Sequence, residues 1–367
     1  MRVAVLGAPG GRGRRVVRDL LERPEVSSVV LVGPHERELA RLVAAWDPRR
    51  VSAAAVPFTV EGISGAFNGL DVAVACLQRA GEPELTAFEA AVATGVPYVS
   101  ACEDPDTIEA MLGQCAKVDA APAVAVPGMS WTPGVSNLLV RAAADQLDTI
   151  ESVRIAWTVS RRDEGADLAR LLAAWSGTAE VIEDGERRHR PAGTNPERRF
   201  FPEPVGWQRV SLARGAEVLT LAETVGDMRS LHVEAGTDGG SAASVALAAA
   251  RTRGRGGVLG RAVRPTLGVV ARTAAAGLTP PNTRGSGWSA LRVDVRGRSA
   301  GAARHETYGI VDHLGNLETA PLVVACLMAG WGEVQSRGIS PPESAFEPGR
   351  FLALLAERGV RAAHLER

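Results

Sequence analysis

Lysine is almost missing from this sequence. Of the 41 lysines and arginines only Lys117 is a lysine, and all the others are arginines. A mechanism that passes through a Schiff base with an enzyme amine would have this single candidate. Lys117 lies on the polar side of a predicted helix, so we do not expect that role. Arginine stays charged and binds carboxylates through paired hydrogen bonds, so an acidic substrate could still be anchored.

Paired cysteines and long apolar runs are missing as well. The four cysteines are widely spaced without a C-x-x-C pair, so the sequence indicates neither a zinc site nor a disulfide framework. No apolar run is long enough to span a bilayer. The first predicted strand begins within the first three residues, so we expect no signal peptide. We therefore expect a cytoplasmic protein without a metal site.

The chain also lacks an excess of charge of either sign. Its net charge is −1, with 46% hydrophobic and 23% charged residues. This balance is typical of a globular protein and does not favour binding to nucleic acid or to an anionic membrane. The partner that we expect is a small-molecule substrate. A chain of 367 residues is long enough for two domains, each with its own core.

The start of the chain is its most informative part. An apolar run at residues 2–6 predicts a buried strand, and apolar residues at helical spacing predict a helix near 11–22. Gly7, Gly10 and Gly13 lie at this junction in a G-x-x-G-x-x-G pattern. Glycine is needed there because the phosphates of a dinucleotide approach bare backbone N–H groups at a helix N-terminus. The sequence therefore predicts a dinucleotide-binding turn.

Short apolar runs alternate with helical patterns up to about residue 145. This alternation predicts a doubly wound parallel sheet of the Rossmann type. The predicted strands are 2–6, 28–32, 53–57, 71–76, 97–100 and 122–126. The predicted helices are near 11–22, 35–46, 60–67, 82–94, 104–115 and 134–145. We assign residues 1–145 to an NAD(P)-binding domain that is completed by C-terminal helices within 314–367.

Residues 146–313 show a different pattern, in which apolar and polar residues alternate. This pattern is typical of a mainly antiparallel sheet and predicts an inserted α+β substrate domain. Its predicted strands include 288–298 and 303–311, and its predicted helices are near 164–176, 240–252 and 258–276. We interpret the Arg-, Pro- and Gly-rich stretch at 185–204 as a solvent-exposed connection, with a lid over the substrate as the alternative.

In a doubly wound sheet the ligand lies beyond the carboxyl ends of the strands. No aspartate directly follows the second predicted strand to bind the ribose hydroxyls, whereas His35, Arg37 and Arg12 are available for a 2′-phosphate. This favours NADP over NAD, although the neighbouring Glu36 opposes it and NAD stays open. The other candidate cofactor contacts are Gly11 in the first turn, Cys76 and Leu77 after the fourth strand, and Ser100 after the fifth.

Several motifs together resemble one family. They lie at residues 7–13, 70–76, 93–100, 127–138, 308–313, 338–343 and 351–359. On these segments the chain resembles the saccharopine dehydrogenase (saccharopine reductase-like) family over nearly its whole length. The resemblance implies a split Rossmann domain, an inserted domain whose sheet supports a homodimer, and NAD(P)-linked oxidoreduction in amino-acid metabolism. Such enzymes transfer hydride at a carbon–nitrogen bond, by imine reduction or secondary amine oxidation.

Proton transfer needs a side chain next to the reacting carbon and nitrogen. The catalytic candidates are Asp312 and His313, which close the last strand of the second domain, and Tyr308. The candidate substrate contacts are Trp131, Thr132, Arg161 and Arg162, of which the two arginines would bind a carboxylate.

Two alternatives stay open. The first is an NADP-dependent carbonyl or enoyl reductase on the same fold, because a shared fold does not name a substrate. The second is a dinucleotide-binding sensor or scaffold without turnover, because Ser100 and Thr132 stand where many family members have aspartate.

Overall fold

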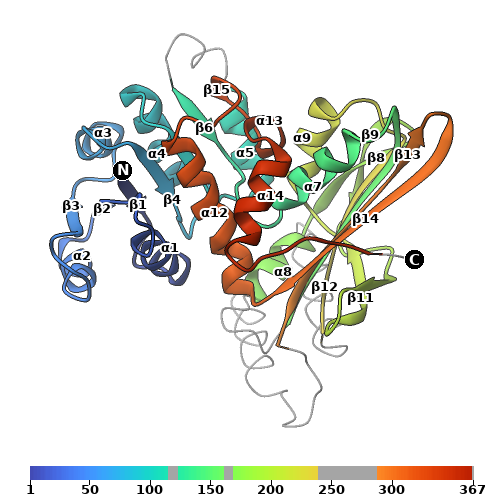
Figure 1. Ribbon diagram of the computed structural model, residues 1–367, viewed down its shortest axis with the longest axis horizontal. Helices are drawn as coiled ribbons and strands as arrows, with labels where there is room; N and C mark the ends of the chain where they lie inside the picture. Colours follow the sequence, from blue (N-terminus) through green and yellow to red (C-terminus); the bar gives the residue numbers. More distant parts are fainter. Residues whose placement is uncertain (115–122, 161–167, 239–286, 366–367) are drawn as a thin grey trace, which may run out of the picture. The chain divides into compact units, whose positions relative to one another are not determined.

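The computed structural model describes residues 1–114, 123–160, 168–238 and 287–365. The chain divides into two compact units (Figure 1). One consists of residues 1–138 and 315–360, and the other consists of residues 139–314 and 361–367. In the described part of the chain, no helix is both long and apolar enough to cross a membrane.

A seven-stranded sheet forms the centre of the first unit. Its strand order is β15-β6-β5-β4-β1-β2-β3, and neighbouring strands are parallel. The strands are β1 (Arg2–Leu6), β2 (Ser28–Gly33), β3 (Val51–Ala55), β4 (Val72–Ala75), β5 (Tyr98–Ser100), β6 (Val124–Val126) and β15 (Gly338–Ile339). This sheet confirms the predicted doubly wound fold, although β3 begins two residues earlier than the sequence indicated.

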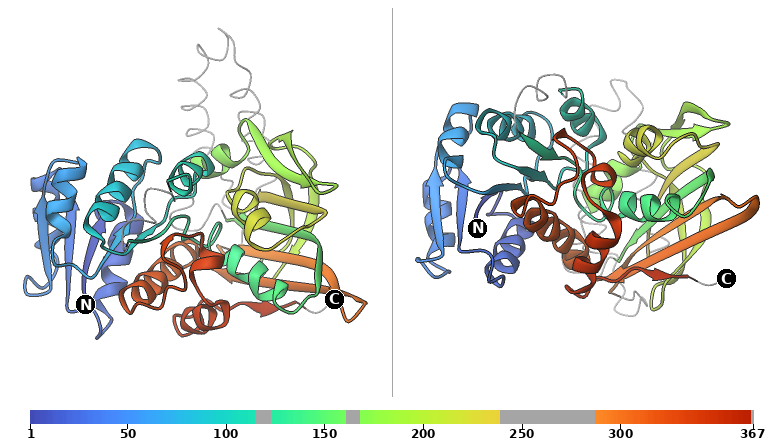
Figure 2. Two further views of the ribbon diagram at one scale, coloured as in Figure 1. Left: turned by 90° about the horizontal axis from the view of Figure 1, so that it is seen from above. Right: turned by 45° about the horizontal axis from the view of Figure 1, so that its top comes forward.

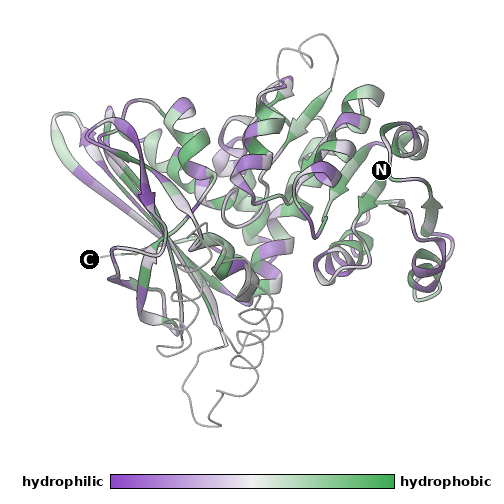
Figure 3. Ribbon diagram, turned by 180° about the vertical axis from the view of Figure 1, so that it is seen from behind, coloured by the Kyte–Doolittle hydropathy of each residue, from purple (hydrophilic) through white to green (hydrophobic). Residues whose placement is uncertain are grey.

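Helices cover both faces of this sheet (Figure 2). Phe67, Phe88 and Met111 of α3, α4 and α5 pack on one face. On the other face Gly330 of α12 lies against Val72. The inner strands are largely apolar because both of their faces are buried, whereas the edge strand β3 is mostly exposed. Figure 3 shows the strands mainly in green. The helices are α1 (Gly11–Leu21), α2 (Glu36–Val43), α3 (Val60–Phe67), α4 (Glu82–Thr94), α5 (Pro105–Leu112), α12 (Leu314–Gly330), α13 (Pro342–Ala345) and α14 (Pro348–Ala356). Helix α7 (Val135–Ala144) begins in this unit and continues into the second.

The second unit is built on a nine-stranded sheet. Its main path is β10-β11-β12-β7-β13-β14-β16, and β8 joins β12 and β9 beside it. The strands are β7 (Thr149–Val159), β8 (Thr178–Glu183), β9 (Glu186–Pro191), β10 (Glu197–Phe201), β11 (Gly206–Leu212), β12 (Ser230–Thr237), β13 (Ser289–Ser299), β14 (Ala302–Asp312) and β16 (Ala363–His364). Among the described strand pairs of this second sheet, only β7 and β12 are parallel.

The helices of the second unit include α8 (Leu168–Ala174) and α9 (Glu217–Thr224). Both contact β12, and α9 also contacts β8. The helices expected near 240–252 and 258–276 lie outside the described residues.

The interpretation of residues 185–204 as a connection or a lid is wrong. This stretch contains the whole of β9 and β10, which pair with β8 and β11, respectively. Its arginines are ordered by partners across the hairpin: Arg187 lies 3.3 Å from Glu180, and Arg190 pairs with Glu183. A high density of charged residues is typical of solvated loops. It also occurs in the edge strands of sheets, where the charges discourage pairing with strands of other chains.

Candidate functional site

The turn between β1 and α1 has little or no room for a side chain at Gly7, Gly10 and Gly13. Gly7 has φ of +76°, and a Cβ there would lie 2.4 Å from the carbonyl oxygen of Cys76. A Cβ on Gly13 would lie 2.3 Å from the carbonyl oxygen of Gly7. At Gly10 the nearest atom would be Nε2 of Gln78, at 2.8 Å. Backbone therefore packs directly on backbone at Gly7 and Gly13, whereas Gly10 borders the end of a flexible side chain.

The start of α1 has the character of an anion site. Gly10 is its N-cap and offers no side chain to the first N–H groups, and the first turn holds no acidic residue. A Cβ on Gly11 would meet no atom within 4 Å. Open N–H groups at the positive end of a helix dipole attract phosphate. The residues of this turn therefore fit the pyrophosphate of a dinucleotide.

Arg12 extends toward β5 rather than β2. Its Nη1 donates to the carbonyl oxygen of Ala101 at 3.1 Å, and its Nη2 donates to Glu103 and Glu318 at 3.1 and 3.0 Å. In the sheet, β4 and β1 separate β5 from β2. The structure therefore does not bring Arg12 together with the residues after β2, and its prediction as a 2′-phosphate contact does not agree with these bonds.

His35 and Arg37 lie where β2 passes into α2. His35 is the N-cap of the helix, Arg37 is in its first turn, and both are exposed. Glu36 is exposed between them, and the buried Leu39 anchors the helix to the sheet. The carboxyl end of β2 is where the adenosine ribose lies in doubly wound dinucleotide-binding folds. The structure thus brings His35 and Arg37 together at that end.

Cys76 and Leu77 directly follow β4. Cys76 is 3% exposed, and burial raises the pKa of its thiol to about 12, so the thiol stays protonated at neutral pH. Gln78, the next residue, is exposed and reaches Gly10. Sequence reasoning did not single out Gln78, although its position two residues after Cys76 and opposite the second glycine could have indicated it.

Ser100 is completely buried at the end of β5. Its hydroxyl donates to the carboxylate of Glu84 and accepts a bond of 2.9 Å from the N–H of Cys102. The Tyr98 hydroxyl donates to the same carboxylate oxygen at 2.7 Å. Burial raises the pKa of Glu84, and the bonds from Ser100 and Tyr98 oppose this rise. Ser100 therefore shapes the turn after β5, and its burial does not agree with direct contact to a cofactor.

Trp131 and Thr132 belong to the turn after β6. They are only 1% and 5% exposed, and the peptide bond between Thr132 and Pro133 is cis. Both predicted substrate contacts are therefore packed inside the turn. Ser130, which was not singled out, donates its hydroxyl to Glu103 at 2.9 Å. That bond joins the turn after β6 to the turn after β5.

Asp312 and His313 lie together at the end of β14 in the second unit. The exposed His313 ring stacks on Trp288, with 4.3 Å between the ring centroids. Its Nδ1 lies 3.1 Å from the carbonyl oxygen of Gly287. This contact requires a proton on Nδ1, which makes Nε2 the basic nitrogen of the neutral ring. The Asp312 carboxylate accepts from the His313 N–H at 2.6 Å.

Tyr308 does not join this pair. It lies four residues earlier on β14, roughly 13 Å along the strand from Asp312. Its ring meets His364 of β16 edge to face at 5.4 Å, and burial raises its pKa. The predicted carboxylate contacts Arg161 and Arg162 lie outside the described residues.

Further polar residues lie at the same end of the strands of this sheet as Asp312. Ser289 of β13 pairs with Asp312, and its hydroxyl accepts from the Ser160 N–H at 3.3 Å. The Ser160 hydroxyl donates to Asp238, which follows β12. Sequence reasoning missed Ser160, Asp238 and Ser289, because single polar residues beside strands carry no motif. The pairing of four neighbouring strands brings them together.

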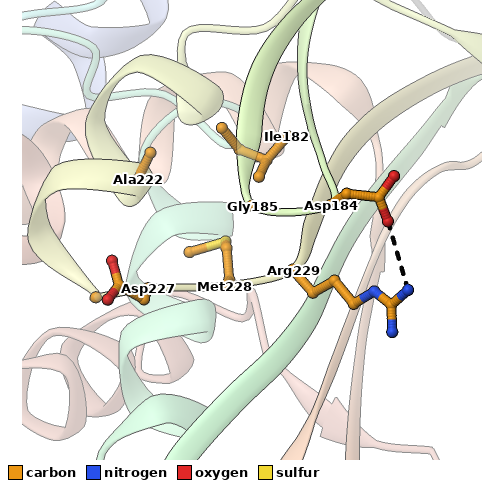
Figure 4. A pocket seen from close by; sticks show the side chains of 8 residues that line it. Ile182, Asp184, Gly185, Ala222, Asp227, Met228 and Arg229 are labelled. Atoms are coloured by element: carbon orange, nitrogen blue, oxygen red, sulfur yellow. Dashed lines mark hydrogen bonds and ion pairs between the residues drawn. The ribbon is translucent and has the colours of Figure 1, made fainter.

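A hollow of about 510 Å³ lies elsewhere in the second unit (Figure 4). Asp184 and Arg229 border it and form an ion pair of 3.4 Å, with most of both side chains in solvent. None of the predicted site residues lines it. Among the described residues, no group of three His, Cys, Asp or Glu side chains is arranged to hold a metal ion.

Solved structures show a similar fold. No family model matches the chain. Apo saccharopine dehydrogenase (L-Glu forming) from Saccharomyces cerevisiae is similar, with a TM-score of 0.69 and 10% identity over 100% of both chains. Two further likenesses are weaker: a Corynebacterium glutamicum myo-inositol dehydrogenase (TM-score 0.44, 14% identity, 100% and 99% covered) and C. glutamicum DAP dehydrogenase in complex with DAP (0.48, 12%, 97% and 95%).

The likeness to saccharopine dehydrogenase confirms, at the level of the fold, the resemblance noted in the sequence. It extends over both units, because the whole of each chain is covered.

Gly10→Val tests the phosphate cradle. The added side chain displaces only the end of Gln78, so the fold should persist while dinucleotide affinity falls by at least about tenfold, or about 1.4 kcal/mol. Titration calorimetry with NADPH measures the loss, and Gly65→Ala, where a Cβ has open space, is the control. Unchanged affinity would place the phosphates elsewhere. Gly13→Val is less informative because it collides with backbone.

Glu84→Gln tests whether the pKa of the buried Glu84 carboxyl group is raised. Because the folded-state pKa of Glu84 is raised, the wild type should lose stability as the pH rises above the ordinary value of 4.5. The glutamine variant keeps an acceptor for Tyr98 and Ser100 and should lose this dependence, whereas Glu84→Leu should cost about 1–3 kcal/mol at every pH. Urea unfolding between pH 5 and pH 8 measures both, with the exposed Glu89→Gln as control. Parallel pH profiles for wild type and Glu84→Gln would contradict the assignment.

Proposed function

We propose that the protein is an NAD(P)-dependent oxidoreductase that transfers hydride at a carbon–nitrogen bond of an amino-acid-derived substrate. The glycine turn carries the dinucleotide part of this proposal, because at Gly7 and Gly13 a Cβ would collide with backbone at the start of a helix with open N–H groups. The sequence motifs and the likeness of the fold to saccharopine dehydrogenase support a carbon–nitrogen bond as the place of hydride transfer.

The first unit would bind the dinucleotide, which supplies or accepts the hydride when bound. The N–H groups at the start of α1 would hold the pyrophosphate, with Gln78 beside them. His35 and Arg37 would bind a 2′-phosphate, which makes NADP the proposed cofactor. Two exposed side chains that can both be positively charged suit a dianionic group better than ribose hydroxyls.

His313 is the proposed proton-transfer residue. Addition of hydride to an imine carbon requires a proton on the nitrogen, and the reverse oxidation releases one. Histidine carries protons in both directions near neutral pH. The bond from Nδ1 to Gly287 and the stacking on Trp288 orient the ring, and Asp312 fixes the main chain at His313.

A cofactor titration followed by a substrate screen tests the function. Purified protein is titrated with NADPH and NADH, and then mixed with pairs of amino acids and 2-oxo acids while nicotinamide absorbance is followed. We expect turnover of a pair of an amine and an oxo acid. The substitution His313→Asn should reduce the rate of this turnover at least about a hundredfold. Turnover only of simple carbonyl or enoyl compounds would shift the reaction class, and binding without turnover would indicate a sensor.

Arg37→Ala tests the choice of cofactor. Loss of a charge-assisted hydrogen bond to the 2′-phosphate should weaken the binding of NADPH by about 1.5–3 kcal/mol and leave the binding of NADH nearly unchanged. Arg41→Ala, an exposed arginine on the same helix, is the matched control. Calorimetry with both dinucleotides measures the difference. Equal losses for NADPH and NADH would remove the argument for NADP.

A further inference from the structure

Arg12 connects three segments of the first unit that are far apart in the sequence. It lies in the first turn of α1, and its guanidinium bonds to the turn after β5 and to α12. We propose that Arg12 is a positioning residue that holds the turns after β5 and β6 in place for the reaction by neutralising Glu103 and Glu318 together. This inference rests on the proposed function and gives Arg12 a role other than phosphate binding.

Two carboxylates share one nitrogen of Arg12. Oε1 of Glu103 and Oε1 of Glu318 lie 3.1 and 3.0 Å from Nη2, while Nη1 donates to Ala101. The three charged side chains are between 17% and 22% exposed. Burial disfavours the charge on Arg12, but Glu103 and Glu318 outweigh it and hold the pKa of Arg12 above its ordinary value. Water screens charges weakly at such burial, so the cation between the two carboxylates offsets their mutual repulsion.

Glu103 extends this restraint to the turn after β6. The fully buried Ser130 donates its hydroxyl to Oε1 of Glu103 at 2.9 Å. A second bond, from the N–H of Met129 to the carbonyl oxygen of Ser100 at 2.7 Å, joins the same two turns. The two turns therefore form one hydrogen-bonded unit that Arg12 anchors to α1.

Arginine is suited to this position for a geometric reason. Its planar guanidinium presents donors in fixed directions and serves three acceptors at once, whereas lysine places a point charge on a flexible stem. Without the cation, Glu103 and Glu318 repel each other. The turn after β5 should then move, because Glu318 is held within the long helix α12.

A displaced turn would affect the reaction more than cofactor affinity. The carboxyl ends of β5 and β6 border the ligand crevice of a doubly wound sheet. Movement there misplaces the groups that face the reacting atoms, while the phosphate cradle at Gly7 and Gly13 stays intact. Misplacement of reacting groups by about 1 Å is enough to reduce the rate strongly.

Three variants and one control test the inference. Arg12→Met removes the charge and the donors, and Arg12→Lys keeps the charge but loses the planar arrangement of donors. Arg12→Met combined with Glu318→Met removes the cation together with one of the two repelling carboxylates. Arg18→Met removes one positive charge from the same helix, where the side chain is 58% exposed, and is the control.

Hydrogen exchange, NADPH calorimetry and steady-state kinetics provide the readouts on the purified full chain. In Arg12→Met, peptides that cover 101–104 and 127–134 should exchange faster, while peptides of α2 should not change. The kcat should fall about tenfold or more, with the Kd of NADPH within about twofold of the wild type. In Arg12→Lys the increase in exchange and the fall in kcat should both be smaller. The double variant should recover part of the lost protection from exchange and part of the lost kcat.

Unchanged exchange at both turns in Arg12→Met would overturn the inference. A loss of NADPH affinity as large as the loss of kcat would assign Arg12 to cofactor binding and overturn it as well. No recovery in the double variant would exclude charge neutralisation as the cause. If the wild type turns over no substrate, the proposed function fails, and the exchange and recovery data alone decide whether Arg12 holds the turns.

Discussion

The close approach of α1 to the end of β1 is the constraint on which the first unit depends. It exists because Gly13 brings the backbone of α1 against the backbone of Gly7, and Gly7 in turn lies as close to the backbone of Cys76 after β4, at distances that no side chain would permit. This approach directs the N–H groups of the first helical turn outward, and it also sets the direction in which Arg12 leaves the helix. One pair of glycines therefore shapes both the proposed phosphate cradle and the ion pairs that join it to the turns after β5 and β6.

The inner strands of the first unit could be predicted because they are largely buried on both faces and appear as apolar runs between glycine-rich turns. The helices at Val60–Phe67 and Glu82–Thr94 agree with the sequence to the residue. Residues 185–204 could not be predicted in the same way, because edge strands rich in arginine carry neither an apolar run nor a clear alternation. Their structure depends on partners in β8 and β11, which sequence patterns do not show.

Topology explains which site residues could be found from the sequence. The residues after β2 and β4 were placed correctly at the carboxyl edge, since all parallel strands end on the same side. The burial of Ser100 could not be inferred from the sequence. A serine after a strand gives the same sequence pattern whether it faces a ligand or, as Ser100 does, the carboxylate of Glu84 on a preceding helix. Gln78 was missed for a related reason: its contact with Gly10 arises only when β4 and β1 are neighbours.

Helix α12 covers part of a sheet of which six strands precede it and only β15 follows it. Gly330 packs against Val72, so this part of the apolar face, beside α1, stays uncovered while residues 139–313 are still being synthesised. A nascent chain with such a surface is a target for chaperones and is prone to aggregate. A chain that ends ahead of α12 would therefore expose the apolar side chains around Val72, even though every glycine of the cradle is already present.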